Sequence, residues 1–277
     1  MERAFRQVEV FAENPYSGNP VAVIINAQGL ATEEMQAIAR WTNLSETTFV
    51  LPPTHTDADY RVRIFTPGAE IPFAGHPTLG TAHAMLESGL QPRNPGQLVQ
   101  ECQKGNVRLR TEEDRLYFAL PEPDVIEIDG EMQENAAASL RIAQTDILCG
   151  ARIDVGPVWL TLQLGSADEI IHLSPDMGRI AKLSGLTGIT VFGAHPDGKF
   201  EIRSFAPAFG VPEDPVCGSG NGCVAALVRR KQLSPASGYT ALQGRCLGRA
   251  GRVEIIYDDA IWVGGHAATC ITGTIKS

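Results

Sequence analysis

The chain has 277 residues, which suit one large domain or two of ordinary size. An apolar fraction of 43% and 28 glycines indicate a globular protein with many turns. The net charge of −9 argues against nucleic acid and against an anionic membrane surface as partners. Because the first residues contain no apolar core of signal-peptide length and no apolar run approaches a membrane span, we expect a cytoplasmic protein.

The six cysteines predict reduced thiols. They form no CxxC pair and no Cys/His spacing typical of a zinc site, and the histidines are scattered. We therefore expect no bound metal. Cys217 is the one cysteine whose surroundings single it out, because it lies in a glycine-rich turn before an apolar segment.

The first half of the chain alternates strand patterns with two helices. Thr32, followed by two glutamates, is placed to cap the first helix. Pro77 suits the first position of a helix and Gly89 the position after its end, which predicts a buried central helix over 77–88. Strands are expected at 5–11, 21–25, 47–51, 61–65, 97–101, 106–110 and 115–119.

The second half, which follows a linker at 121–123, repeats the first. It predicts a helix opening at 174–177, a second central helix over 221–233 and late strands at 253–257 and 260–263. The matching segments are 63–67 with 203–207 at a shift of 140, 35–39 with 177–181 and 48–50 with 190–192 at 142, and 72–80 with 215–223 at 143. We therefore predict a duplicated α+β fold in which each half is a curved sheet wrapped on one apolar helix.

Each half contains a strand, a glycine-containing turn and a helix of small residues. Such a turn leaves backbone N–H groups at a helix N-terminus, where a carboxylate or phosphate binds well. Two of these turns, one in each half, predict a small anionic ligand held in a cleft between two similar domains.

Four side chains near these turns can move protons: Glu46, His76, Asp214 and Cys217. Glu46 precedes an apolar strand, and an acid at such an edge tends to have a raised pKa, which suits proton transfer near neutral pH. Its counterpart in the second half is Gly188, so the duplication itself does not require an acid there.

Taken alone, these four residues also have structural interpretations. Glu46 fits a solvated loop acid, His76 a group that satisfies backbone atoms at a helix start, and Asp214 a turn residue before proline. Cys217 fits either an inert core thiol or a thiolate stabilised by a helix N-terminus. The residues by themselves leave these alternatives open.

Residues 43–50, 63–67, 72–82 and 213–219 closely resemble the phenazine-biosynthesis isomerase family (PhzF-like), and Phe11 with 18–23 resembles its opening motif. The resemblance spans nearly the whole chain in the right order. It implies a diaminopimelate-epimerase-like fold of two pseudo-symmetric domains, each a β-barrel around a helix, with no cofactor and a homodimeric assembly. The final strand of that fold returns to the first domain, so the implied domains are 1–119 with 264–277, and 120–263.

The resemblance also implies roles for individual residues. Glu46, His76 and Asp214 match the catalytic acid, histidine and aspartate of the family. The substrate-binding positions are Gly75, Cys217, Gly218 and Ser219, of which Gly218 and Ser219 match the pair that holds a carboxylate. The implied reaction is a proton shift within a small carboxylic acid, in which Glu46 carries the proton between two carbons.

Cys217 departs from the family pattern, which usually has Thr there. Related epimerases and proline racemases have Cys before that glycine and a second thiol at the first turn, where this chain has Ala74. A two-thiol racemase is therefore excluded. An epimerase, racemase or dehydratase that pairs Cys217 with Glu46 is not, and a metabolite-binding protein without turnover is the alternative from another class.

Overall fold

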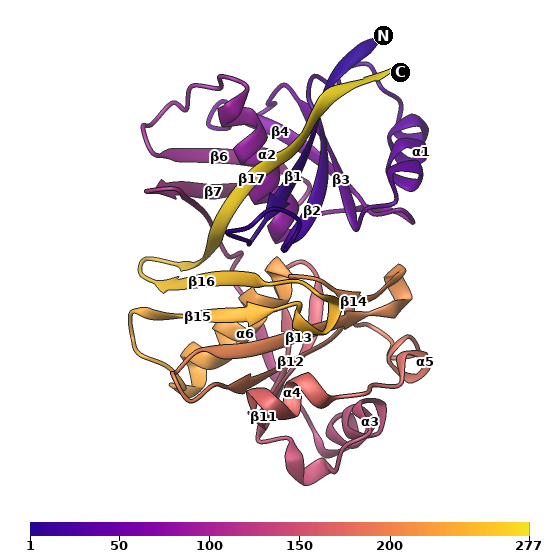
Figure 1. The fold of residues 1–277 in the computed structure, drawn as a ribbon, viewed down its shortest axis with the longest axis vertical. Coiled ribbons are helices and arrows are strands. Elements are labelled where there is room, and N and C mark those ends of the chain that lie inside the picture. The colour runs from indigo at the N-terminus through magenta and orange to yellow at the C-terminus, as the bar shows by residue number, and fades with distance from the viewer. Residues whose placement is uncertain (277) are drawn as a thin grey trace. The chain divides into compact units, whose positions relative to one another are not determined.

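The computed structural model describes residues 1–276, which form two compact units. Unit 1 comprises residues 1–119 and the end of the chain from Gly264, and unit 2 comprises residues 120–263. Both units combine strands with a small number of helices, and the predicted α+β class is confirmed (Figure 1). No helix among residues 1–276 is long and apolar enough to cross a membrane.

Unit 1 is a closed barrel of eight strands. Around the barrel the order is β1, β2, β3, β4, β6, β7, β8 and β17, and β17 pairs with β1 to close it. The pairs β2–β3 and β4–β6 are parallel. The strands are β1 (Glu2–Val10), β2 (Asn19–Ile24), β3 (Glu46–Leu51), β4 (Tyr60–Phe65), β6 (Gln97–Cys102), β7 (Gly105–Glu112), β8 (Arg115–Ala119) and β17 (Ile261–Lys276), and the short β5 (Glu70–Ile71) pairs with β4.

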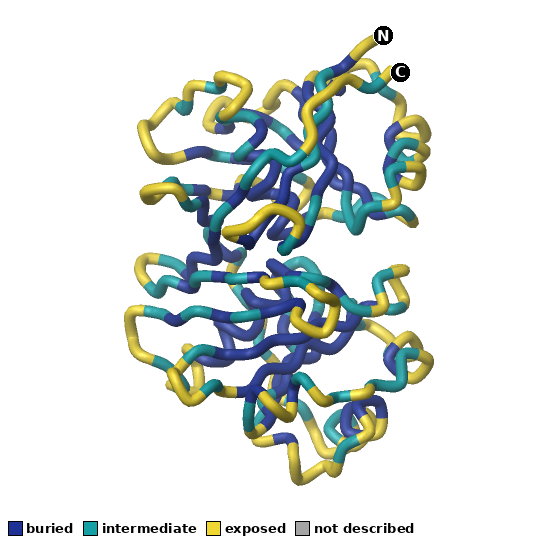
Figure 2. The backbone as a smooth tube through the Cα atoms, viewed as in Figure 1, coloured by how far each residue is buried: buried dark blue, intermediate teal, exposed yellow. Residues whose placement is uncertain are grey.

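Helix α2 (Gly75–Glu87) fills this barrel and contacts β1, β2, β3, β6 and β8. Nearly all of its first ten residues are buried, in agreement with the buried central helix predicted from the sequence (Figure 2). Gly80 lies against the barrel wall, where an added Cβ would come within 2.3 Å of Val21 Cγ1. The close approach of helix and strand therefore depends on a residue without a side chain.

Helix α1 (Thr32–Thr42) packs outside the barrel through Met35 and Ala39. The prediction that Thr32 caps it is wrong by one residue. Ala31 is the N-cap, and the Glu34 carboxylate accepts its backbone N–H at 2.8 Å. A glutamate three residues after the cap thus satisfies the backbone N–H of the cap residue, and no side chain of the cap accepts from the first turn.

Unit 2 repeats the pairing pattern of unit 1. Its strands run in the order β9, β10, β11, β12, β13, β15, β16, and the pairs β11–β12 and β13–β15 are parallel, as β2–β3 and β4–β6 are. Helix α6 (Gly218–Lys231) packs on β10, β11, β12 and β16. The strands are β9 (Asp124–Glu127), β10 (Cys149–Asp154), β11 (Val158–Ser166), β12 (Gly188–Ala194), β13 (Phe200–Ala206), β14 (Val211–Asp214), β15 (Gly238–Gln243) and β16 (Gly251–Tyr257).

Both central helices begin earlier than predicted, at Gly75 and Gly218. The glycines were expected to form the turns, yet the first helical residue directly follows the N-caps Ala74 and Cys217. The glycine-rich sequence is therefore the first turn of each helix, where backbone N–H groups have no partner within the helix.

The outer helices of unit 2 differ most from the prediction. The segment expected to mirror α1 forms only α5 (Met177–Ile180), and a separate α4 (Ala167–His172) contacts β11, β12 and β13. The preceding region, which has no counterpart in unit 1, adds α3 (Gly130–Leu140) and a short 3-10 turn, η1 (Gln144–Asp146). Two further 3-10 turns are η2 (Pro207–Phe209) and η3 (Arg245–Leu247).

Candidate active site

In unit 1 the structure brings Glu46 and His76 together. Glu46 is the first residue of β3, and His76 is the second residue of α2 inside the barrel. Glu46 Oε2 lies 3.4 Å from His76 Nε2, and the side chains are 12% and 3% exposed. The imidazole and the Glu46 oxygen that faces it are thus enclosed, and the exposed part of the Glu46 side chain lies elsewhere.

Burial lowers the pKa of His76 to about 3, and the backbone carbonyl of Pro20 opposes this shift only in part. His76 is therefore neutral at physiological pH. Its contact with Glu46 joins a carboxyl group to a neutral ring, so it is not an ion pair.

Two further polar residues hold the other side of the histidine ring. The amide nitrogen of Asn19 lies 3.3 Å from His76 Nδ1, and the Ser45 hydroxyl donates to Asn19 Oδ1 at 3.1 Å. Sequence reasoning missed both residues as parts of the site. Their only signal was position, since Asn19 lies in a Gly-Asn-Pro motif and Ser45 directly precedes Glu46.

In unit 2 the structure brings Asp214, Cys217 and Ser219 together. Asp214 ends β14, Cys217 is the N-cap of α6, and Gly218 and Ser219 open the helix. Burial raises the pKa of Asp214 to about 6, against the opposing hydrogen bonds of the Cys217 thiol and the Val216 N–H, while the charge of Glu213 raises it further. Asp214 therefore exchanges protons close to neutral pH.

The Cys217 sulfur is the side-chain cap of α6. It accepts the backbone N–H of Gly220 at 3.2 Å and lies 3.6 Å from the Ser219 hydroxyl. The indole N–H of Trp159, a buried residue of β11, donates to Ser219 Oγ at 3.0 Å. The indole thereby fixes the hydroxyl, which keeps its own hydrogen to donate.

A buried amide pair fixes the backbone of this turn. Gln243 Oε1 accepts from the Cys217 N–H at 3.1 Å and from Asn221 Nδ2 at 2.8 Å. Gln243 Nε2 donates to the backbone oxygen of Asp214 at 3.0 Å. Gln243 thus joins the end of β14 to the start of α6, and no sequence motif had pointed to it.

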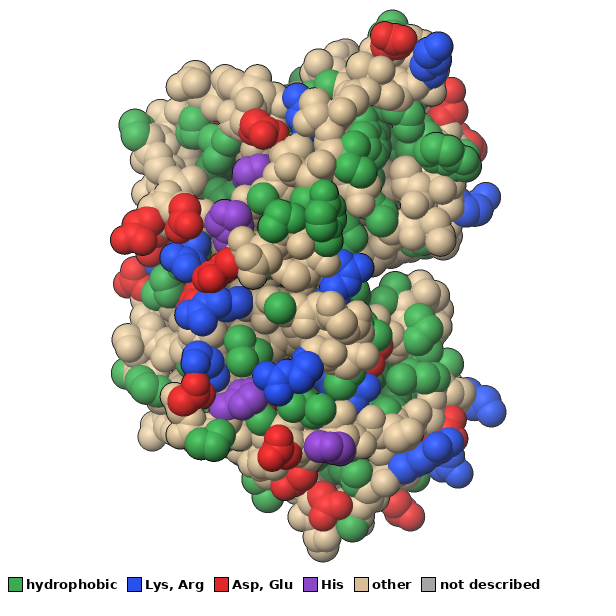
Figure 3. Space-filling view, viewed as in Figure 1, with side chains coloured by type: hydrophobic (Ala, Val, Ile, Leu, Met, Phe, Trp, Pro, Cys, Tyr) green, Lys and Arg blue, Asp and Glu red, His purple; other side chains and the backbone are tan. Residues whose placement is uncertain are grey.

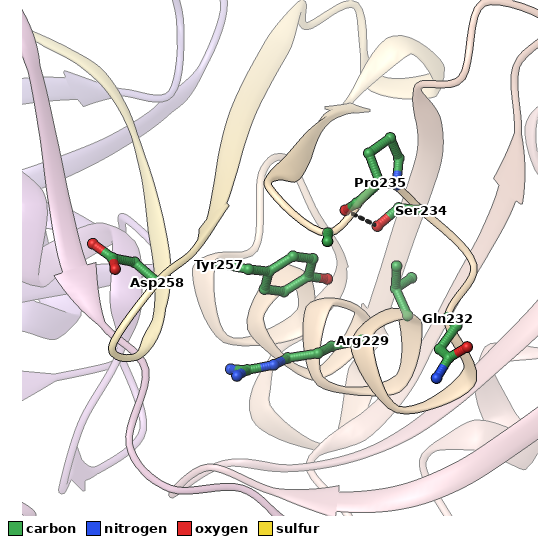
Figure 4. A pocket seen from close by; sticks show the side chains of 8 residues that line it. Arg229, Gln232, Ser234, Pro235, Tyr257 and Asp258 are labelled. Carbon is green, nitrogen blue, oxygen red and sulfur yellow. Dashed lines mark hydrogen bonds between the residues drawn. The ribbon is translucent and has the colours of Figure 1, made fainter.

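Other parts of the described chain offer less. Residues 1–276 contain no group of three or more side chains arranged to hold a metal ion. A pocket of about 480 Å³ lies at the far end of α6, lined by Arg229, Tyr257 and their neighbours (Figure 4). Its Tyr257 hydroxyl donates to Ala225 O, and the Ser234 hydroxyl donates to Pro235 O. None of the predicted site residues lines it.

On the face shown in Figure 3, acidic and basic side chains are interspersed in both units. An anionic ligand approaching this face therefore meets no broad basic surface. The groups in the described chain that suit an anion are local, and the N-termini of α2 and α6 are two of them.

A family model described as "Phenazine biosynthesis-like protein" matches residues 8–273. The chain belongs to this family. A relative from Schizosaccharomyces pombe, "Antisense-enhancing sequence 1", is 40% identical over 98% of each chain. The trans-2,3-dihydro-3-hydroxyanthranilate isomerase of Pseudomonas aeruginosa is 35% identical, over 89% of this chain and 87% of that enzyme.

The phenazine biosynthesis-like fold is also shared with a solved structure. The PhzF-family protein of Enterococcus faecalis is 26% identical, with a TM-score of 0.80 and full coverage of both chains. The resemblance noted from the sequence motifs is thereby confirmed. With relatives named as isomerases, the protein is an enzyme of the isomerase or epimerase type.

Proposed function

We propose that this phenazine biosynthesis-like protein is a cofactor-independent isomerase that moves a proton between two carbons of a small carboxylic acid. Glu46 is the general acid and base. The observation that carries the proposal is the position of Glu46, whose carboxyl group lies against a buried neutral imidazole while its side chain keeps 12% of its surface exposed. A carboxyl group placed beside a neutral imidazole can take up a proton and release it within one turnover.

Comparison of the two units supports the interpretation that Glu46 is present for function and is not required by the fold. In the parallel pairs of the two units, Glu46 is opposite Val21 and Gly188 is opposite Trp159. A Cβ at Gly188 would come within 1.9 Å of the Phe205 carbonyl oxygen, so unit 2 excludes any side chain there. Unit 1 departs from this pattern with an acid, and that acid is the one in contact with His76.

The start of α6 supplies the groups for a substrate carboxylate. The backbone N–H groups of Gly218 and Ser219 lie in the first turn, where the helix dipole favours an anion. The Ser219 hydroxyl adds a donor that Trp159 holds in place. In our proposal Asp214 is a second proton-exchanging group, and Gly75 at the start of α2 is a further substrate-binding position.

The principal alternative is an epimerase, racemase or dehydratase in which Cys217 is a base. One observation favours the isomerase instead. The thiol hydrogen-bonds the Asp214 carboxylate and its sulfur caps the helix, which are the functions that a threonine hydroxyl performs at an N-cap. An adjacent carboxylate also opposes formation of a thiolate. We therefore assign Cys217 to substrate binding and turn geometry.

The Pseudomonas relative suggests the class of substrate to test first. Its name describes a cyclic carboxylic acid that carries an amino and a hydroxyl group. We propose that this chain also acts on a small cyclic or amino-bearing carboxylic acid, and trans-2,3-dihydro-3-hydroxyanthranilate is the first compound to assay.

The decisive experiment compares wild type with Glu46→Gln, during turnover in D₂O. Glutamine keeps the shape of the side chain but cannot carry a proton, so we expect a loss of turnover of about 10²- to 10⁴-fold. An isomerase incorporates deuterium at the carbon that accepts the proton, an epimerase exchanges the α-carbon, and a binding protein incorporates none. Unchanged turnover by Glu46→Gln on a substrate that the wild type converts would reject the proposal.

A further inference from the structure

Two arginine–glutamate pairs occupy matching positions in the two units. In unit 1, Arg63 on β4 donates through Nε and Nη2 to the two carboxylate oxygens of Glu70 on β5, at 2.7 and 2.6 Å. In unit 2, Arg203 on β13 donates in the same way to Glu213 on β14, at 2.8 Å for each bond. We call each pair a clamp, because this two-pronged geometry fixes both side chains.

The clamps are the same although the residues around them have diverged. Each arginine lies over the ring of the phenylalanine two residues later, at 5.1 Å from Phe65 and 4.9 Å from Phe205. In contrast, three other matching positions hold different residues in the two halves. They pair Glu46 with Gly188, Ala74 with Cys217 and His76 with Ser219. A feature kept through that divergence serves a need common to both units, and each clamp holds the strand that leads into a central helix.

The clamp of unit 2 is the more buried and the more connected. Its side chains are 8% and 10% exposed, against 24% and 17% in unit 1. Arg203 Nη1 also donates to the backbone oxygens of Ile170 and Leu173, at the end of α4. Glu213 directly precedes Asp214 on β14, so α4, β13 and the aspartate are joined through one guanidinium.

We propose that Arg203 and Glu213 are positioning residues for Asp214, which they hold at the N-terminus of α6. This inference rests on the function proposed above, in which Asp214 exchanges protons with the substrate. The clamp acts through geometry, because Glu213 cannot turn without moving the adjoining residue. It also acts through charge, because it places an anion and its neutralising cation beside Asp214.

The charge effect has a definite sign. Burial is the largest cause of the raised pKa of Asp214; the Cys217 thiol and the Val216 N–H lower this pKa, and the Glu213 carboxylate raises it. Arg203 neutralises Glu213, and Glu201 and Cys246 in turn act on Arg203. Removing the charge of Glu213 therefore lowers the pKa of Asp214, whereas removing that of Arg203 leaves Glu213 uncompensated and raises it.

The test is a titration followed by carbon-13 NMR of protein labelled at the aspartate carboxyls, and it needs no substrate. The Asp214 signal is the one that Asp214→Asn lacks. We expect Glu213→Gln to move its midpoint down and Arg203→Gln to move it up, each by roughly one pH unit. The double variant should return toward wild type. Glu70→Gln, the matched change in unit 1, should leave this midpoint in place.

Opposite shifts support the inference, because a merely structural role would not give the two variants opposite signs. Shifts in one direction, or none, would overturn it. If Arg203→Gln does not fold, Arg203→Lys is the second variant. Lysine keeps the positive charge but cannot donate two parallel hydrogen bonds to Glu213, so the titration midpoint of Asp214 should stay while turnover falls about 10- to 100-fold. Full turnover by that variant would equally overturn the inference. Full turnover by Asp214→Asn would instead reject the proposed role of Asp214, whatever the NMR shows.

Discussion

Cys217 is the proposed site residue whose substitution separates two chemistries. In the isomerase, Cys217→Thr should be mild, within about tenfold in turnover, because the hydroxyl can accept the Gly220 N–H and donate to Asp214 as the thiol does. The measurement is steady-state kinetics with the substrate that the wild type converts.

In a thiol-dependent epimerase the same change would be as damaging as Glu46→Gln, and iodoacetamide would inactivate the wild type with protection by substrate. A Cys217→Thr enzyme that binds substrate normally but turns over a hundredfold more slowly would contradict our assignment.

Asp214 makes a prediction about stability that requires no substrate. Its pKa is raised from 3.8 to about 6 in the folded protein, so between these values the folded state binds more protons than the unfolded state. The contribution of Asp214 to stability is therefore complete below about pH 4 and is lost as the pH rises through 6.

Asp214→Asn removes this titration. We expect the variant to gain on the order of 1 to 3 kcal/mol relative to wild type between pH 4 and pH 7.5, measured by urea unfolding at both values. If the difference in the free energy of unfolding between wild type and Asp214→Asn is the same at both pH values, the pKa of Asp214 is not raised in the folded state.

The predictability of the site follows from the type of contact. Glu46, His76 and Asp214 could be proposed as site residues because a turn, a helix start or a strand edge marks them within a few residues of sequence, and because they match the motifs of the resembled family. Asn19, Trp159 and Gln243 could not, because their contacts join segments 57, 60 and 26 residues apart in the chain. Such contacts are set by strand register, which appears only when the barrel is assembled.

The helix α2 depends on close packing more than on helix propensity. Gly80→Ala would favour a helix by about 1 kcal/mol, but its Cβ would lie 2.3 Å from Val21 Cγ1 and 3.1 Å from Val10 Cγ2. Since both valines are buried, we expect a net loss of about 1 to 3 kcal/mol in the free energy of unfolding.

The matched control is Gly130→Ala at the first position of α3, where an added Cβ meets no atom within 4 Å. Chemical denaturation should show this variant to be as stable as wild type or slightly more so. Equal stability of the two variants would mean that α2 does not approach the barrel wall as closely as described.

The helices and strands themselves were predictable to different degrees. The duplicated motifs predicted both central helices. Their starts were predicted too late, because the glycines of each first turn were read as loop residues. The second outer helix was expected by analogy with α1, yet Asp176 caps only the four residues of α5. Residues 120–150 could not be assigned because β9 is stabilised by pairing with β10 and has no alternating pattern of its own.

For the assembled protein, the family resemblance leads us to propose a homodimer. Light scattering coupled to gel filtration should give twice the 29.8 kDa of one chain. A mass of one chain at micromolar concentration would reject this assembly.

Strand β17 has a consequence for the order of events during synthesis. Its residues from Gly264 pair with β1 and β8 and close the barrel of unit 1, although they leave the ribosome after all of unit 2. Domains generally fold in the order of translation, but the barrel around α2 cannot close until the last strand emerges. The barrel of unit 1 therefore stays open during synthesis, with the edges of β1 and β8 unpaired, while all strands of unit 2 have already been made. A released chain truncated before Gly264 should accordingly have a protease-resistant unit 2 and a protease-sensitive unit 1.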